Sequence, residues 1–210
     1  MDLSELKLLV FDLDGVLIDS KDYWASILHD TLKKFGYEIS YEDVKRRLGP
    51  RAEEVLVDIS GPNAPIREML SYVEDLCKRD EYLSKIKFFS AVRDVIKSLR
   101  TKYKLAMITN SPYEMAEYVL KKMDILRFFD EVVDLFSTRR SKADAIKIIS
   151  EVMKIPMDSV AYVGDMVRDV EEARKAGCRS IAIVGWSSYD ELKKAGPDLL
   201  IRNLQELLSF

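Results

Sequence analysis

The stretch LLVFDLDGVLIDS, Leu8 to Ser20, carries an apolar run directly into three acidic residues, Asp12, Asp14 and Asp19. The run Leu8–Phe11 is apolar throughout, which is typical of a strand covered on both faces in a parallel sheet. Carboxylates placed close together repel each other, and burying them is costly unless a cation or hydrogen-bond donors compensate. We therefore predict that this stretch is a buried strand that ends at a metal-binding or reactive site.

Further along the chain, short apolar runs of strand type alternate with amphipathic segments of helical length. This alternation predicts a doubly wound α/β fold, in which a parallel sheet is joined by right-handed helical crossovers. The expected strands are Lys7–Phe11, Lys104–Thr109, Glu131–Phe136, Ser159–Gly164, Ser180–Val184 and Asp198–Ile201, and the expected helices are Ala91–Arg100, Pro112–Lys122, Lys142–Met153, Val167–Ala176 and Ser188–Ala195.

The segment from about Ser20 to Lys85 breaks this alternation, because its helical patterns are separated by glycine-containing breakers and it has no convincing strand. We therefore predict an α/β core, residues 1–18 and 86–210, with a small all-helical subdomain, residues 19–85, inserted after the first strand. A single α/β domain with a long helical excursion is the alternative that this pattern leaves open.

The composition suits a protein with a sizeable core, since 48% of the residues are hydrophobic and 33% are charged. The formal net charge of -3 gives no reason to expect nucleic acid as a partner, whereas a small phosphorylated molecule needs only a local cluster of donors. We see no signal peptide and no apolar run of membrane-spanning length, so we expect a cytoplasmic protein that does not bind membranes. Its two cysteines, Cys77 and Cys178, are then expected to be free thiols.

The residues that follow the predicted strands carry the chemistry, because open α/β sheets bind ligands outside the carboxyl ends of their strands. Mg²⁺ prefers hard oxygen ligands such as carboxylates. One carboxylate can attack phosphorus, a second carboxyl can transfer protons, and a lysine and a hydroxyl can stabilise the transferring group. A set of these groups therefore indicates phosphoryl transfer with Mg²⁺. Its members are Asp12, Asp14, Thr109, Asn110, Lys142, Asp165 and Asp169.

Four segments, in order, resemble the motifs of the haloacid dehalogenase-like phosphohydrolases. They are FDLDGVLIDS, ITNSP, Lys142 within RRSKADA, and VGDMVRDVEEARKAG. The resemblance spans residues 7 to about 205. It implies that superfamily's α/β fold, with the helical insert as the small cap that closes over the site.

The resemblance implies catalytic and substrate-binding roles. Asp12 would be the nucleophile that becomes an aspartyl phosphate, and Asp14 would be the general acid and base. Thr109 would hydrogen-bond the phosphoryl group, with Asn110 beside it in the same substrate site. Lys142 would orient Asp12 and offset negative charge.

The resemblance also implies a magnesium site. Asp12, the backbone carbonyl of Asp14 and Asp165 would hold the ion, and Asp169 would support it indirectly or through water. Taken singly, the same residues have structural interpretations: DLDG as a turn, Thr109 as a cap, Lys142 as a solvated lysine and Asp169 as a helix-surface acid. Their order along the chain is what favours the functional interpretation.

Some positions depart from the pattern of the resembled family. Phe89 and Ser90 stand where many relatives have a Pro-Gly turn, Ala143 follows the lysine in place of a frequent proline, and Met166 replaces a small hydroxyl residue. None of these changes removes a catalytic group. They do weaken an assignment to a well-known subfamily.

The helical segment offers one candidate for substrate selection. Arg51 follows Gly49 and Pro50, in a region that reaches over the catalytic mouth in caps of this type, so it is a candidate for binding a distal anion of the substrate. The single histidine, His29, lies near apolar residues of an amphipathic segment, which is typical of a packing or surface contact.

These observations predict a Mg²⁺-dependent phosphatase of a small phosphorylated metabolite, similar to phosphoglycolate phosphatase, that works through an aspartyl phosphate. The alternatives are a sugar phosphomutase similar to β-phosphoglucomutase and a non-catalytic protein of the same fold that binds a metal or ligand. A dehalogenase is disfavoured, because Asp14 supplies acid–base chemistry that dehalogenation does not need. A monomer and a homodimer are both compatible with the sequence.

Overall fold

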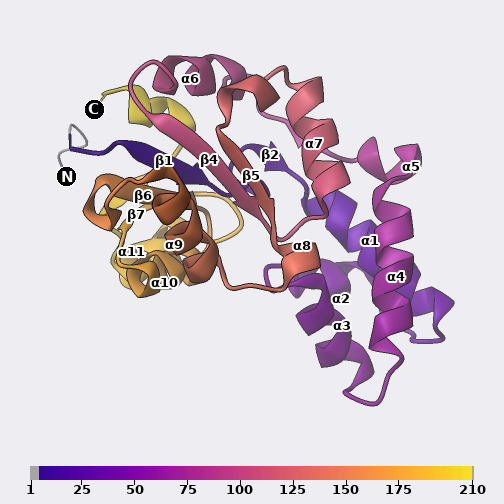
Figure 1. Ribbon diagram of the computed structural model, residues 1–210. Helices are drawn as coiled ribbons and strands as arrows, with labels where there is room; N and C mark the ends of the chain where they lie inside the picture. The colour runs from indigo at the N-terminus through magenta and orange to yellow at the C-terminus, as the bar shows by residue number, and fades with distance from the viewer. Residues whose placement is uncertain (1–4, 210) are drawn as a thin grey trace. The chain divides into compact units, whose positions relative to one another are not determined.

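The computed structural model describes residues 5–209, which form two compact units (Figure 1). Residues 5–17 and 88–209 belong to the first, which we call the α/β unit. Residues 18–87 form the second, which we call the helical unit. Among residues 5–209, no helix has the length and apolar character needed to cross a membrane.

Six parallel strands form the sheet of the α/β unit, in the order β5–β4–β1–β6–β7–β8. At its centre lies β1 (Leu8–Phe11), where Leu8 is aligned with Lys104 of β4 on one side and with Val160 of β6 on the other. All four β1 side chains are fully buried. The predicted fold class, a doubly wound parallel α/β sheet, is confirmed. The remaining strands are β4 (Lys104–Thr109), β5 (Glu131–Asp134), β6 (Val160–Gly164), β7 (Arg179–Ile183) and β8 (Leu199–Ile201).

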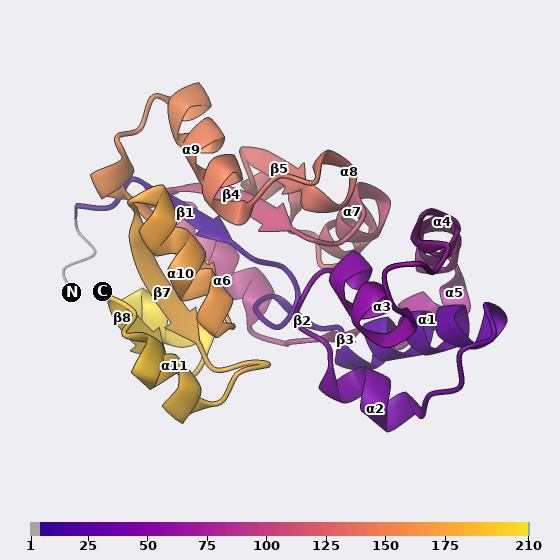
Figure 2. The ribbon, with the colours of Figure 1, turned by 90° about the horizontal axis from the view of Figure 1, so that it is seen from below.

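Helices cover both faces of this sheet (Figures 1 and 2). On one face, Leu8 and Val10 of β1 share a core with Ile146 and Ile149 of α9 and with Ala173 of α10. On the other face, α6 packs beside the C-terminal helix η3. The helices of this unit are α6 (Val92–Leu99), α7 (Tyr113–Lys122), η1 (Leu126–Phe128), α8 (Leu135–Thr138), α9 (Lys142–Met153), η2 (Met157–Ser159), α10 (Val167–Ala176), α11 (Tyr189–Ala195) and η3 (Leu204–Ser209).

The predicted strand Glu131–Phe136 is wrong at its last two residues. Strand β5 ends at Asp134, and Leu135 begins the short helix α8. The reason is local, because the Asp134 carboxylate accepts the backbone N–H of Ser137 at 2.7 Å and so caps the helix. This helix cap therefore ends the strand at Asp134, although the apolar pattern favoured a longer strand.

The helical unit is held together by polar contacts between its helices as well as by an apolar core. The Tyr23 hydroxyl of α1 donates to the Cys77 carbonyl of α4 at 3.1 Å, and Tyr82 of α5 donates to Asp30 of α1 at 2.8 Å. The two short strands β2 and β3 pair with each other where the chain enters and leaves this unit. Its elements are β2 (Ile18–Asp19), α1 (Lys21–Lys34), α2 (Tyr41–Arg46), α3 (Ala52–Ser60), α4 (Ile66–Cys77), α5 (Asp80–Leu83) and β3 (Lys87–Phe88).

The burial of α9 against the sheet gives a stability prediction. We expect Ile146→Ala to lower the free energy of unfolding by about 2–5 kcal/mol, because it removes a fully buried side chain and leaves a cavity. The matched change Val152→Ala, on a residue of the same helix that is 63% exposed, should cost less than about 0.5 kcal/mol. Urea unfolding of both variants measures the difference, and equal effects would contradict this packing.

Candidate active site

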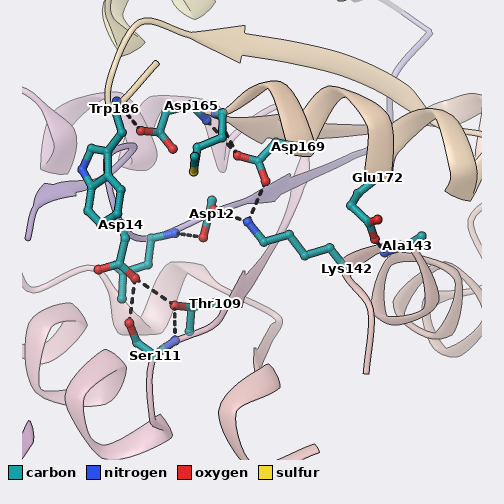
Figure 3. A network of polar contacts seen from close by, with 12 residues as sticks. Asp12, Asp14, Thr109, Ser111, Lys142, Ala143, Asp165, Asp169, Glu172 and Trp186 are labelled. Atoms are coloured by element: carbon teal, nitrogen blue, oxygen red, sulfur yellow. Dashed lines mark hydrogen bonds and ion pairs between the residues drawn. The ribbon is translucent and has the colours of Figure 1, made fainter. Parts of the chain in front are cut away.

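The site is built around Asp12, the first residue after the central strand β1 (Figure 3). Asp12 is buried, with 6% of the residue exposed. One carboxylate oxygen accepts the backbone N–H of Leu13 at 2.8 Å, and the other accepts the Lys142 ammonium at 2.5 Å. Because both oxygens are held, the carboxylate has a fixed orientation at the carboxyl end of the sheet.

Lys142 begins α9 and is the cation of the site. Besides Asp12, its Nζ contacts Asp169 Oδ1 at 2.6 Å, and it lies 5.6 Å from the ring centroid of the buried Tyr162. The two carboxylates hold the pKa of Lys142 well above its usual value, although burial alone would lower it. The Lys142 side chain is only 11% exposed, so the alternative that it is a solvated lysine is wrong.

Asp165 follows β6, and Asp169 lies one turn into the next helix, α10. Asp165 Oδ2 accepts the backbone N–H of Trp186 at 2.6 Å. Both oxygens of Asp169 accept hydrogen bonds, Oδ1 from Lys142 and Oδ2 from the backbone N–H groups of Asp165 and Met166 at 3.1 and 3.0 Å. These contacts fix the loop that carries Asp165 and favour a supporting role for Asp169.

Asp14 lies on the other side of Asp12, against the end of β4 and the loop that follows it. Its Oδ2 accepts the Ser111 hydroxyl at 2.6 Å and faces the Thr109 hydroxyl at 3.3 Å. Thr109 Oγ1 in turn accepts the backbone N–H of Ser111 at 3.0 Å, which leaves its own proton free to be donated. Two hydroxyl groups therefore hold the carboxylate of Asp14.

The two other predicted substrate-binding residues differ in their placement. Asn110 follows β4 between Thr109 and Ser111, and its buried Oδ1 accepts no hydrogen bond from residues 5–209. Arg51 belongs to the helical unit, where it precedes the first residue of α3. The α/β unit thus brings together all the predicted site residues except Arg51, whose role stays a prediction.

Burial raises the pKa values of two carboxyl groups in this cluster. Burial is the main cause that raises the pKa of Asp12 to about 7, with Lys142 opposing the shift and Asp169 and Asp14 adding to it. The pKa of Asp165 is also raised well above its usual value, mainly by burial and then by Asp169 and Asp12. Burial therefore disfavours the charged form of these carboxylates unless a further positive charge is present.

The three buried aspartates form an arrangement that fits a divalent cation. Carboxylate oxygens of Asp12, Asp165 and Asp169 lie within 4.8 Å of one another. All three supply hard oxygen donors, which Mg²⁺ prefers. The Lys142 ammonium is the cation that pairs with Asp12 and Asp169, so three carboxylates share one positive charge. The residues present therefore fit the predicted ion.

Two glycines allow the backbone to close around Asp165. A Cβ atom on Gly15, whose φ is +77°, would lie 2.0 Å from Asp165 Oδ2, and one on Gly185 would lie 2.5 Å from the same oxygen. Only glycine fits at either position without displacing the carboxylate. The closeness of the Asp165 carboxylate thus explains why glycine occupies both positions.

Three further residues of the site were not predicted. Ser111 lies within the ITNSP segment, two residues after Thr109. Its closeness to Thr109 is the one sequence feature that could have placed it in the site. The amide of Trp186 comes from the loop after β7 and has no signal in the sequence. Glu172 lies three residues after Asp169, so helical spacing places it on the same face of α10.

Comparisons with known proteins agree with this geometry. Residues 9–183 match the family described as haloacid dehalogenase-like hydrolase. The chain belongs to this family. A protein of Caldanaerobacter subterraneus subsp. tengcongensis, named as a candidate pyrophosphatase (PpaX), is 31% identical over 96% of this chain and 92% of its own length.

Other members of the family agree over the whole length of the chain. A phosphoglycolate phosphatase of Aquifex aeolicus is 28% identical over 98% of this chain and 96% of its own. A haloacid dehalogenase-like hydrolase of Streptococcus pneumoniae has the same fold, with a TM-score of 0.85, 23% identity and 98% of both chains covered. The predicted family and the predicted enzyme class, a phosphoric monoester hydrolase, are confirmed by these matches.

The raised pKa of Asp12 predicts how the metal-free protein responds to pH. Between the pKa of an unfolded aspartate, about 3.9, and about 7, the folded protein binds more protons than the unfolded chain, so its free energy of unfolding falls as pH rises. Aspartates with lowered pKa values, such as Asp130 and Asp198, make the free energy of unfolding rise with pH, but only below about pH 4.

We therefore expect the melting temperature in EDTA to fall between pH 5 and about 8. Mg²⁺ should restore much of the loss at the upper end, because it binds only the folded cluster. The Asp12→Asn variant should show a weaker dependence on pH. A melting temperature that rises with pH over this range would contradict the burial of these carboxylates.

Proposed function

We propose that this protein is a Mg²⁺-dependent phosphatase of a small phosphorylated metabolite and that it works through an aspartyl phosphate on Asp12. The observation that carries the proposal is the pairing of the buried Asp12 carboxylate with Lys142, beside the carboxylates of Asp165 and Asp169. A carboxylate oriented in this way is suited to attack phosphorus in line with the leaving group.

In the first step, an Asp12 oxygen forms a bond to phosphorus while the bond from phosphorus to the leaving oxygen breaks. Asp14, in its protonated form, gives its proton to that leaving oxygen. The Thr109 proton and the Lys142 ammonium stabilise charge on the transferring phosphoryl oxygens. Bound Mg²⁺, held by Asp12, the carbonyl of Asp14 and Asp165, would neutralise the clustered negative charge.

In the second step, Asp14 takes a proton from water as the water oxygen attacks phosphorus of the aspartyl phosphate. The bond between Asp12 and phosphorus breaks, inorganic phosphate leaves and both aspartates return to their starting states. Ser111 supports both proton transfers. Its hydroxyl still donates a hydrogen bond to the Asp14 carboxylate when the Thr109 hydroxyl donates to the phosphoryl group instead.

For the substrate, we propose an anion attached to the phosphoryl group. Relatives named as phosphoglycolate phosphatases favour a carboxylate there, and the relative named as a candidate pyrophosphatase favours a second phosphate. The first is our main proposal and pyrophosphate hydrolysis is the second candidate. In both cases we propose that Arg51 of the helical unit binds this distal anion.

The test of the chemistry is phosphate release from phosphoglycolate, pyrophosphate, p-nitrophenyl phosphate and β-glucose 1-phosphate, with Mg²⁺ and with EDTA. We expect release that depends on Mg²⁺ and falls at least about 10³-fold in Asp12→Asn, because the amide is a poor nucleophile. Isomerised sugar phosphate without free phosphate would indicate a phosphomutase. Mg²⁺ binding without turnover of any substrate would favour a binding protein.

Arg51 gives a separate prediction about selectivity. Arg51→Ala should raise KM about tenfold for phosphoglycolate, because a charge-assisted hydrogen bond is lost, and leave KM for p-nitrophenyl phosphate within about twofold. Arg46→Ala, on an exposed arginine of the same unit that pairs with Asp43, is the matched control and should change neither value. Equal increases for both substrates would remove Arg51 from substrate recognition.

A further inference from the structure

Glu172 is a buried acid that the proposed chemistry does not use. It lies on α10, three residues after Asp169, and is 5% exposed. A buried carboxylate is costly unless it is hydrogen-bonded, so its partners indicate why it is there.

The two oxygens of Glu172 have different partners, of which Figure 3 shows Ala143. Oε2 accepts the backbone N–H of Ala143 at 3.0 Å, in a buried contact with α9. Oε1 accepts the Lys175 ammonium at 2.8 Å, but the Lys175 side chain is 63% exposed, and pairs of that kind contribute little. The buried contact with Ala143 is therefore the specific one.

Ala143 is the second residue of α9 and directly follows Lys142. The first amides of a helix have no partner within the helix. In α9 the amide of Asp144 is satisfied by the Ser141 hydroxyl at 3.1 Å, and the amide of Ala143 is satisfied by Glu172. The negative charge of Glu172 also lies at the end of α9 where the helix dipole favours it.

The same helix α10 holds the other end of the lysine. Asp169 Oδ1 contacts Lys142 Nζ at 2.6 Å, while Glu172 holds the backbone next to the Lys142 Cα atom. Residues three apart lie on one helix face, so a single face of α10 holds both the base and the tip of this side chain. A lysine stem is flexible, so a contact at its tip alone does not fix it. The Glu172 contact adds a second, buried hold at the first turn of α9, beside the core packing of Ala143.

We propose that Glu172 is a positioning residue for Lys142, which it holds in place through the amide of Ala143 at the first turn of α9. This inference rests on the role proposed above for Lys142. A carboxylate that merely stabilised the fold would change the melting temperature without changing the access of solvent to the Lys142 amine.

The test compares Glu172→Met, which keeps the length of the side chain and removes the acceptor, with Glu172→Gln, which keeps an acceptor oxygen. Glu171→Met, on the exposed neighbouring acid of the same helix, is the matched control. Two measurements are made below the melting temperature of every variant. The first is steady-state kinetics with p-nitrophenyl phosphate and Mg²⁺, which gives kcat and KM. The second is acetylation of Lys142 relative to the exposed Lys147, measured by mass spectrometry.

We expect Glu172→Met to lower kcat about tenfold, with KM changed less than about threefold, and to raise Lys142 acetylation toward that of Lys147. Glu172→Gln and Glu171→Met should stay within about twofold of the unmodified protein in kcat. The inference is overturned if Lys142 stays protected in Glu172→Met, or if the Met and Gln variants lose activity equally. Because acetylation needs no substrate, it remains decisive even if the protein hydrolyses none of the compounds above.

Discussion

The carboxylates of Asp12, Asp165 and Asp169 are buried around one ammonium group, that of Lys142, and the rest of the site accommodates this imbalance of charge. Each carboxylate receives at least one backbone N–H. The donor is Leu13 for Asp12 and Trp186 for Asp165, while Asp169 accepts from the two residues that precede α10. These donors reduce the cost of burial but supply no net charge. The arrangement therefore suits a divalent cation, which would supply the positive charge that these donors do not.

The parallel sheet makes such a cluster possible. Strands β1 and β6 are neighbours, so the residues that follow them, Asp12 and Asp165, meet at one edge. Lys142 reaches the same edge from α9, and α10 returns from β6 to hold it. Rigidity at this edge comes from elements that are packed through the core below it, since α9 and α10 share the apolar cluster around Leu8 and Val10.

Much of this arrangement could be predicted from the sequence, because its signals are local. The apolar run before Asp12 predicted a buried strand, and the bounds of α9 and α10 agree with the helical patterns that predicted them. The order of the acidic residues and Lys142 along the chain indicated their convergence. The structure brings these residues together at the carboxyl end of the sheet, as expected.

The contributions that could not be predicted depend on tertiary contacts. The amide of Trp186 reaches Asp165 because two loops meet across Gly15 and Gly185, and backbone donors carry no residue-specific signal. Glu172 occupies an ordinary helical position whose partner lies on another helix. The predicted end of β5 was wrong for a different reason. The Asp134 side chain caps the short helix α8, and this local hydrogen bond outweighs the apolar pattern that predicted a longer strand.

The pairing of β2 with β3 has a consequence for how the chain folds. Residues 18–87 leave the α/β unit and return to it through two strands that lie side by side, so the ends of this long excursion are neighbours. Closing a flexible loop costs conformational entropy that grows by about 0.6 kcal/mol for each doubling of its length. A compact excursion whose ends pair with each other behaves as a short connection between β1 and α6. The sheet can therefore carry a large insert at little more entropic cost than a turn.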